Sequence, residues 1–311
     1  MSVIKVSHIT KDYGNQRGVF DVSFEMNEGE VLGFLGPNGS GKTTTIRQLM
    51  GFMKPDQGEV TILGMDCFND SAKVQEKVGY LPGEIAFMED MSGLEFIRFM
   101  AKMKNMKDMS KAEELMKFLE LDARGKMKRM SKGMKQKIGI VIAFMHDTPI
   151  LILDEPTSGL DPLMQNKFVE LIQNAKKAGK TILMSSHIFE EVENTCDRVV
   201  MIKEGHIVAT KTMDDLKKNR LKHYEIHFFD ESEAIAFSQK YPQSQRDKKI
   251  IHLMLKGHTN QLLQDLSEYD IDDFNARPQS LEELFLHYYG GEQQCQWYCL
   301  KENGNLIIRY F

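Results

Sequence analysis

The sequence predicts an α/β fold followed by a smaller α+β domain. From residue 3 to about residue 212, short apolar runs of strand length alternate with segments of helical periodicity. One of these runs leads directly into a glycine-rich loop and a helix. A charged segment at 214–222 then precedes a return of strand-like alternation, which indicates the second domain.

The composition is that of a globular protein with a sizeable core. The 311 residues are enough for two domains of roughly 150 residues each. The net charge of −5 is close to zero and of the wrong sign for a dedicated nucleic-acid binder. With 41% hydrophobic residues, the chain is neither intrinsically disordered nor a small disulfide scaffold.

The sequence predicts neither a membrane span nor a signal peptide. Its longest uninterrupted apolar stretch, 138–145, is far shorter than the ~20 residues that a spanning helix needs. Charged residues stand where a signal peptide would need its apolar core, and the cysteines lack the spacing of a metal site. We therefore expect a cytoplasmic protein with reduced thiols. The charged residues are Lys5, Lys11 and Asp12, and the cysteines are Cys67, Cys196, Cys295 and Cys299.

Each expected strand of the first domain is a short aliphatic run, and a helical segment interrupts the series. The helical segment covers about 83–145 and holds 11 of the 21 methionines. Four of them recur at a three-residue interval from Met100 to Met109. We favour an adaptable helical core for this stripe over a docking face for a partner helix, because methionine fills irregular gaps. The strands are expected at 31–35, 60–63, 150–153, 181–184 and 199–202.

We place the domain boundary near residue 215. Residues 1–215 form the first domain, and residues 216–290 form a small accessory domain. In the accessory domain, 224–228 and 251–255 alternate as strands, and 281–289 is predicted to be a closing helix. Residues 291–311 differ in composition from everything before them, so this tail is expected to contribute little to the fold or to catalysis.

The glycine-rich loop at 36–43 is the strongest functional signal. It matches G-x-x-x-x-G-K-[ST], with a strand before it and a helix after it as that motif requires. Glycines let consecutive backbone N–H groups surround phosphate oxygens, and the helix N-terminus adds its positive end. Lys42 supplies a charge for the β- and γ-phosphates, and the Thr43 hydroxyl is suited to ligate Mg²⁺. The predicted nucleotide-binding residues are Gly36, Pro37, Asn38, Gly39, Ser40, Gly41, Lys42, Thr43 and Thr44.

Two acidic residues follow the predicted strand at 150–153. Ligands of an open parallel sheet bind at the carboxyl ends of its strands. Asp154 is therefore expected to hold Mg²⁺ through its water shell, and Glu155 to align or activate an attacking water. Together with the glycine-rich loop, these acids predict a phosphate-loop enzyme.

Further segments closely resemble the ATP-binding subunits of ABC transporters over residues 3 to about 212. Residues 131–134 resemble that family's signature motif, and 158–161, ending at Asp161, match its D-loop. His187 matches the switch histidine, and Tyr13 lies where the family stacks an aromatic ring on adenine. Simpler interpretations exist for each, such as a helix N-cap at the signature, but six motifs in order outweigh them. The signature residues are Ser131, Lys132, Gly133 and Met134.

Two departures from the family pattern matter. The signature reads MSKGM instead of LSGGQ, but the Ser131 hydroxyl, the helix-start N–H groups and the Lys132 charge should preserve phosphate binding. The family's Q-loop glutamine is missing, and Gly83 and Glu84 stand in its place. We hypothesise that the Glu84 carboxylate substitutes for it near Mg²⁺; an exposed loop acid is the alternative.

The resemblance implies an ATP-hydrolysing subunit of a membrane transporter, most similar to bacterial drug-resistance exporters with a separate permease. The implied cofactors are ATP and Mg²⁺. The implied partners are an integral-membrane permease at the inner face of the cell membrane and a second ATP-binding subunit, identical or different. In the family's head-to-tail dimer, Ser131 and Gly133 of one copy face the γ-phosphate held by Lys42 of the other. The resemblance also implies that Glu155 is the general base or a water-orienting carboxylate, and that His187 holds the γ-phosphate and the geometry of the water.

The main alternative is a soluble ABC-type ATPase that acts on ribosomes or DNA. Translation-type members usually carry two ATPase halves, whereas this chain has one phosphate loop. DNA-repair types insert a long coiled coil, whereas only 88 residues separate Thr43 from Ser131. We interpret the basic residues around the signature as a solvated helix face and expect no nucleic-acid partner. These residues are Lys126, Lys128, Arg129, Lys132, Lys135 and Lys137.

Overall fold

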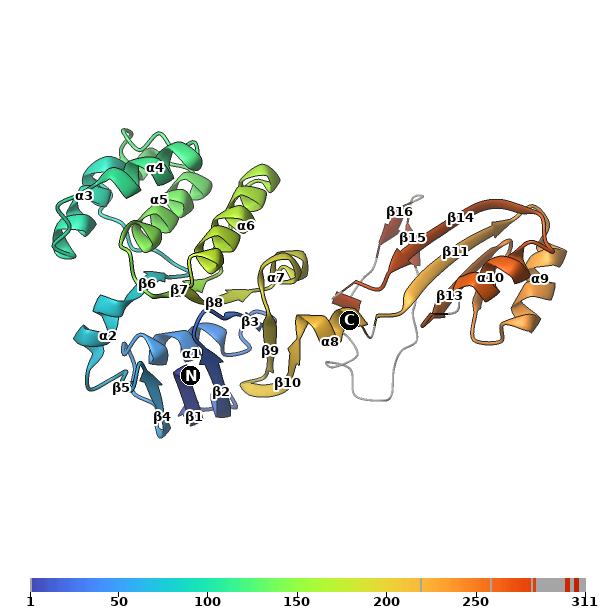
Figure 1. Cartoon of the computed structure of the whole chain (residues 1–311), viewed down its shortest axis with the longest axis horizontal. Helices are drawn as coiled ribbons and strands as arrows, with labels where there is room; N and C mark the ends of the chain where they lie inside the picture. The colour runs from blue at the N-terminus through green and yellow to red at the C-terminus, as the bar shows by residue number, and fades with distance from the viewer. Residues whose placement is uncertain are drawn as a thin grey trace. The chain divides into compact units, whose positions relative to one another are not determined.

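The computed structural model describes residues 2–218, 220–257, 259–280, 282–283, 300–302 and 305–307. The chain divides into two compact units, residues 1–218 and 219–311, each with its own hydrophobic core (Figure 1). Among the described residues, no helix has the length and apolar character needed to cross a membrane.

A six-stranded sheet with the order β10-β9-β3-β8-β7-β6 is the centre of the first unit. Its strands are parallel except β10, which pairs antiparallel with β9. Every residue of β3, β7 and β8 is buried, as continuous apolar runs require when both sheet faces are covered. The strands are β3 (Val31–Leu35), β6 (Val78–Leu81), β7 (Ile150–Asp154), β8 (Thr181–Ser186), β9 (Arg198–Lys203) and β10 (His206–Thr212).

An antiparallel sheet with the order β2-β1-β4-β5 shares its core with helix α1 and strand β3. The rings of Phe24 and Phe34 join the two sheets with centroids 5.4 Å apart, and Ile46 of α1 packs in the same cluster. This core fixes the helix that begins behind the glycine-rich loop. The elements are β1 (Ser2–Asp12), β2 (Gly18–Asn27), β4 (Gln57–Ile62), β5 (Met65–Asp66) and α1 (Lys42–Leu49).

The helical subdomain lies between β6 and β7 in the chain, and its helices gather together beside the sheets (Figure 1). A capping box of Ser92 and Glu95 starts α3. The core interpretation of the methionine stripe is wrong for Met103, which is 67% exposed, because the stripe does not follow one helix face: α3 ends at Met103, and Met106 lies beyond it. The elements are α2 (Ser71–Lys77), which precedes β6, and α3 (Gly93–Met103), α4 (Ser110–Phe118), η1 (Met127–Arg129) and α5 (Lys132–Met145).

The second unit is a small α+β domain, as the sequence predicts. Helices α9 and α10 cover one face of a four-stranded antiparallel sheet, β12-β13-β11-β14, around Tyr224, Phe237 and Leu262. The closing helix expected at 281–289 lies outside the described residues except for 282 and 283, which are helical. Most of the tail at 291–311 also lies outside them. The elements are β11 (Lys222–Phe228), α9 (Glu231–Lys240), β12 (Gln245–Asp247), β13 (Ile250–Leu255), α10 (Thr259–Leu266), β14 (Ile271–Pro278), β15 (Leu300–Glu302) and β16 (Asn305–Ile307).

Three helices complete the first unit: α6 (Pro162–Lys177), α7 (Phe189–Thr195) and α8 (Met213–Lys218). Helix α6 follows β7, and α7 follows β8. The segments at the carboxyl ends of β3, β7 and β8 therefore meet at one edge of the sheet. That edge is the place where ligands of parallel sheets bind.

Candidate active site

The glycine-rich loop connects β3 to α1 at this edge of the sheet. A Cβ atom on Gly36 would lie 2.4 Å from the carbonyl oxygen of Ile202, so no larger residue fits there. Gly41 has a φ of +110° and caps α1 in a left-handed conformation that favours glycine. Lys42, only 5% exposed, folds back over the loop, and its Nζ donates to the carbonyl oxygens of Gly36 at 2.7 Å and Pro37 at 3.2 Å.

The loop opens into a hollow of about 430 Å³. Tyr13 lines this hollow and is 52% exposed, and the Tyr13 hydroxyl donates to Met53 Sδ at 2.9 Å. Arg17 lines the same hollow and was not predicted from the sequence. The lining combines an aromatic ring, two cationic side chains and the loop that starts α1, which fits a nucleoside triphosphate. The lining residues are Tyr13, Arg17, Gly18, Asn38, Gly39, Gly41, Lys42, Thr43, Thr44 and Glu155.

Asp154 ends β7 and is completely buried. Its Oδ1 accepts a hydrogen bond from the Ser185 hydroxyl of β8, whereas its Oδ2 has no hydrogen-bond partner in the protein. A Cβ atom on Gly83 would lie 3.2 Å from this Oδ2. Burying a carboxylate oxygen without a partner is costly, so this oxygen is suited to a cation or its water shell. The Asp154 carboxylate and the hydroxyl of Thr43, which lines the hollow, are oxygen ligands of the kind that fits Mg²⁺.

Glu155 lies between two basic side chains at the edge of the hollow. Its Oε1 is 3.3 Å from Lys42 Nζ, and its Oε2 pairs with His187 Nδ1. Its backbone has a φ of +50°, a left-handed conformation that is rare for residues other than glycine. Strain of this kind persists only where the surroundings impose it, and such places are often functional sites. The structure thus brings together Lys42, Glu155 and His187, three residues that the sequence analysis predicted to lie in the site.

The turn after β7 is held by groups that the sequence analysis missed. Gln136 of α5, only 5% exposed, donates from Nε2 to the carbonyl oxygens of Glu155 at 3.3 Å and Pro156 at 2.8 Å. Ser185 accepts the backbone N–H of Glu155 at 3.0 Å. A glutamine among the apolar positions of the α5 sequence was the one available signal for Gln136. Ser185 gave none, because serine at the end of a strand is common.

Glu191 of α7 is a buried acid close to this turn and was also missed. Burial raises the pKa of Glu191 to about 7, and the Glu155 charge adds to this increase. Hydrogen bonds from Ser186 and Thr157, together with the nearby His187, act in the opposite direction. The net increase makes this side chain a mixture of acid and carboxylate near neutral pH.

This titration predicts a pH-dependent stability. Because the pKa of Glu191 is higher in the folded protein than its ordinary 4.5, its stabilising contribution is complete below about pH 4.5 and is lost as pH rises through about 7. Glu191→Gln cannot titrate, so its free energy of unfolding relative to wild type should rise between about pH 5 and pH 8, by roughly 3 kcal/mol at most. Urea unfolding of both proteins at the two pH values measures this difference. An equal difference at both values contradicts the prediction.

The signature segment contacts the D-loop of its own chain. Ser131 caps α5 by accepting the backbone N–H of Met134 at 3.2 Å. Lys132 Nζ donates to the Ser158 hydroxyl at 2.8 Å, and a Cβ atom on Gly133 would lie 2.7 Å from the carbonyl oxygen of Gly159. None of the signature residues lines the hollow at the phosphate loop of the same chain.

Two other predicted site residues are Asp161 and Glu84. Asp161 caps α6 by accepting the backbone N–H of Met164 at 3.0 Å. Glu84 is exposed, and within the described part of the chain its side chain makes no hydrogen bond or ion pair. The structure places Gly83, rather than Glu84, against Asp154.

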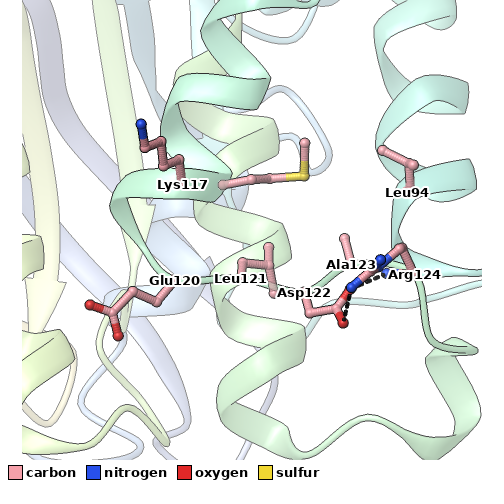
Figure 2. Close-up of a pocket in the computed structure, with 8 residues that line it drawn as sticks. Leu94, Lys117, Glu120, Leu121, Asp122, Ala123 and Arg124 are labelled. Atoms are coloured by element: carbon pink, nitrogen blue, oxygen red, sulfur yellow. Dashed lines mark hydrogen bonds and ion pairs between the residues drawn. The ribbon is translucent and has the colours of Figure 1, made fainter.

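A second hollow, of about 490 Å³, lies on the helical subdomain (Figure 2). Leu94 of α3, Lys117 of α4 and Leu121 of the loop after α4 line it, and Arg124 pairs with Asp122 beside them. It shares no lining residue with the hollow at the phosphate loop.

The α/β sheet, the phosphate loop and the paired acids define a phosphate-loop nucleoside triphosphatase. The family model for ABC transporters matches residues 19–158. The chain is 32% identical to the bacitracin transport ATP-binding protein of Bacillus licheniformis, over 93% of this chain and 98% of that protein. It is 36% identical to the linearmycin resistance ATP-binding protein of Bacillus subtilis, over 69% and 70% of the two chains. The chain belongs to the ATP-binding proteins of ABC transporters.

Solved structures agree with this assignment. The structure of an ATP-binding subunit of an ABC transporter has a TM-score of 0.63 and 32% identity, over 70% of this chain and 92% of that one. A dimeric ATP-binding cassette in a post-hydrolysis state with ADP and phosphate has a TM-score of 0.60 and 25% identity, over 68% and 98%. The resemblance predicted from the motifs, including the drug-resistance branch, is thereby confirmed.

The chain is thus an ATP-binding and ATP-hydrolysing subunit of a transporter. The alternative of a soluble ATPase that acts on ribosomes or DNA is excluded by these relatives. The predicted P-loop fold with a helical subdomain is confirmed by both the structure and its neighbours.

Proposed function

We propose that this chain powers the export of an antibiotic-like compound through a separate membrane permease. Support comes from relatives that are named for bacitracin transport and linearmycin resistance and that match 69–93% of this chain. The permease would hold the chain at the inner face of the cell membrane. A second ATP-binding subunit, identical or different, would complete the working dimer, in line with the dimeric cassette to which this chain is similar.

One observation carries the proposed mechanism: Glu155 is held between Lys42 and His187 beside the phosphate loop. A carboxylate in this place can accept the proton of a water that attacks the γ-phosphate, and His187 can orient that carboxylate and the phosphoryl group. Lys42 and the N–H groups of the loop stabilise the negative charge on the transferring phosphoryl group. Tyr13 offers its ring to the adenine.

The donor set at the end of β7 supports a magnesium cofactor. Asp154 and Thr43 would hold the ion, because Asp154 has a buried oxygen without a protein partner and Thr43 lies in the hollow. When bound, Mg²⁺ neutralises charge on the β- and γ-phosphates. Ser185 keeps the Asp154 side chain in one orientation by donating to its other oxygen.

We further propose that Ser131, Lys132, Gly133 and Met134 act on the nucleotide of the partner subunit. Support comes from two observations. None of these residues lines the hollow of their own chain, and Ser131 is exposed. The backbone N–H groups at the start of α5 can therefore face an anion. The D-loop, with Asp161, lies against the signature and would move with it.

A mixing experiment tests this arrangement. Lys42→Ala and Ser131→Ala should each abolish ATPase activity, but a mixed dimer retains one site built from an intact Lys42 and an intact Ser131. An equimolar mixture of the two full-length variants should therefore recover up to about a quarter of the wild-type activity. A mixture of wild type with either variant calibrates subunit exchange. A mixture of the two variants that stays as inactive as its components, with exchange demonstrated, would reject the trans arrangement.

The role of Glu84 also remains a proposal, supported by the Gly83 backbone beside Asp154. If the Glu84 carboxylate reaches the magnesium site during turnover, Glu84→Ala should raise the Mg²⁺ concentration for half-maximal ATPase activity several-fold. Glu89, an exposed acid in the same segment, provides the control variant Glu89→Ala. An unchanged Mg²⁺ requirement in Glu84→Ala would make Glu84 a solvent-exposed loop residue only.

A further inference from the structure

We propose that Glu191 is a positioning residue that fixes the segment after Glu155 relative to the strand end that carries His187. This inference rests on the roles proposed above for Glu155 and His187. Glu191 does not line the hollow at the phosphate loop, so it acts through its neighbours.

Glu191 connects two segments that approach the site from different strands. Its Oε2 accepts hydrogen bonds from the Ser186 hydroxyl at 2.7 Å and from the Thr157 hydroxyl at 3.2 Å. Ser186 immediately precedes His187, whereas Thr157 follows Glu155 by two residues. One carboxylate oxygen thus links the segments that carry the two members of the Glu155–His187 pair.

Both hydroxyl partners are integrated into their local backbone. The Ser186 hydroxyl also accepts the backbone N–H of Ile188 at 2.9 Å, so it sets the chain direction on both sides of His187. The carbonyl oxygen of Thr157 accepts the N–H of Leu160 at 3.0 Å in the turn after β7. Glu191 itself is 6% exposed and lies on α7, whose carbonyl at Glu191 accepts the Thr195 hydroxyl. The side chain that joins the two segments is therefore buried and held.

The position has a feature that a purely structural role does not explain. The second carboxylate oxygen, Oε1, is buried without a hydrogen-bond partner. An apolar residue would avoid this cost if packing were the only requirement. What an apolar residue cannot do is accept from Ser186 and Thr157 at one point. A misplacement of about 1 Å at an active site can reduce turnover by as much as ~10²-fold, so such a link can affect catalysis through the positions of Glu155 and His187.

The geometry also defines a conservative variant. Because both hydroxyls donate to Oε2, the carbonyl oxygen of a glutamine can accept both hydrogen bonds, and its amide group takes the place of the unpartnered Oε1. Glu191→Gln therefore keeps the link, whereas Glu191→Ala removes it. Glu190, the exposed neighbour, gives the matched control Glu190→Ala.

Steady-state ATPase kinetics of the full-length chain test the proposal. Glu191→Ala should lower kcat about 10-fold or more with the KM for ATP changed less than about two-fold, because the residue acts on the geometry of Glu155 and His187 and not on nucleotide binding. The kcat of Glu191→Gln should stay within about three-fold of wild type, and the kcat of Glu190→Ala should equal that of wild type. Thr157→Val should lower kcat in wild type but add nothing in the Glu191→Ala background.

Three results would overturn the proposal: near wild-type kcat in Glu191→Ala, an equal loss in Glu191→Gln, or full additivity with Thr157→Val. If Glu191→Ala does not fold, Thr157→Val and Glu191→Gln still decide, since only the former breaks part of the link. Glu155→Gln, measured in parallel, separates this failure from that of the proposed function. If Glu155→Gln retains turnover, the assignment of the base fails; if Glu155→Gln is inactive and Glu191→Ala is not, only the inference about Glu191 fails.

Discussion

Replacement of Glu155 by glutamine is expected to lower the ATPase turnover of the full-length chain by about 10²–10⁴-fold while ATP binding is retained. The glutamine keeps the size of the side chain and can still accept from His187 Nδ1. It loses the negative charge that we propose takes a proton from water. In the structure Glu155 pairs with Lys42 through Oε1 and with His187 through Oε2, so its carboxylate is already oriented before any reaction.

If hydrolysis opens the proposed dimer, the same variant should accumulate as an ATP-bound dimer. Size-exclusion chromatography with and without ATP measures this shift, and phosphate release measures turnover. Glu170→Gln, which removes an exposed carboxylate from α6, should behave as wild type in both assays. Turnover within about ten-fold of wild type in Glu155→Gln would remove Glu155 from the role of base.

The buried parallel strands were the part of the fold most accessible to sequence reasoning. The runs at 31–35 and 150–153 are continuously apolar, and the structure places β3 and β7 over the same residues within one position. A strand buried on both faces has no polar alternation to interrupt its signal. The motif residues that follow such strands could be located for the same reason.

In the antiparallel sheet, the run expected at 60–63 overlaps β4, whereas β1 and β2 escaped prediction because their alternation changes phase. Register shifts occur in β1 between Val6 and Ile9, and His8 and Asp21 have positive φ values of 50° and 52°. The two residues face each other, with His8 Nδ1 2.6 Å from Asp21 Oδ1. Each such irregularity changes the parity of the buried positions, from Ile4 and Val6 to Ile9 in β1, so a period of two is lost over the length of the strand.

The supports of the candidate site could not be read from the sequence, because they come from distant parts of the chain. Gln136 and Glu191 reach the turn after Glu155 from helices on opposite sides of it in the sequence. Their partners are backbone carbonyls and hydroxyls, which carry no motif. The left-handed φ of Glu155 likewise results from contacts with its surroundings and not from a local glycine.

Lys42→Ala is expected to weaken ATP binding by about 10²-fold. In the structure Lys42 Nζ already donates to the carbonyl oxygens of Gly36 and Pro37 and pairs with Glu155, so binding exchanges these partners for phosphate oxygens. The exchange is favourable because charge-assisted bonds to phosphate are stronger than bonds to neutral carbonyls.

The dissociation constant of the full-length chain for ATP measures this effect and can be compared with that for ADP. Because Lys42 is proposed to contact the β- and γ-phosphates, the loss should be larger for ATP than for ADP. Lys73→Ala removes an equal charge from the exposed surface pair with Asp70 and should leave both constants unchanged. An unaltered ATP affinity in Lys42→Ala would contradict the assignment of the loop at 36–43 as the phosphate site. An equal loss for the two nucleotides would restrict Lys42 to the phosphates that they share.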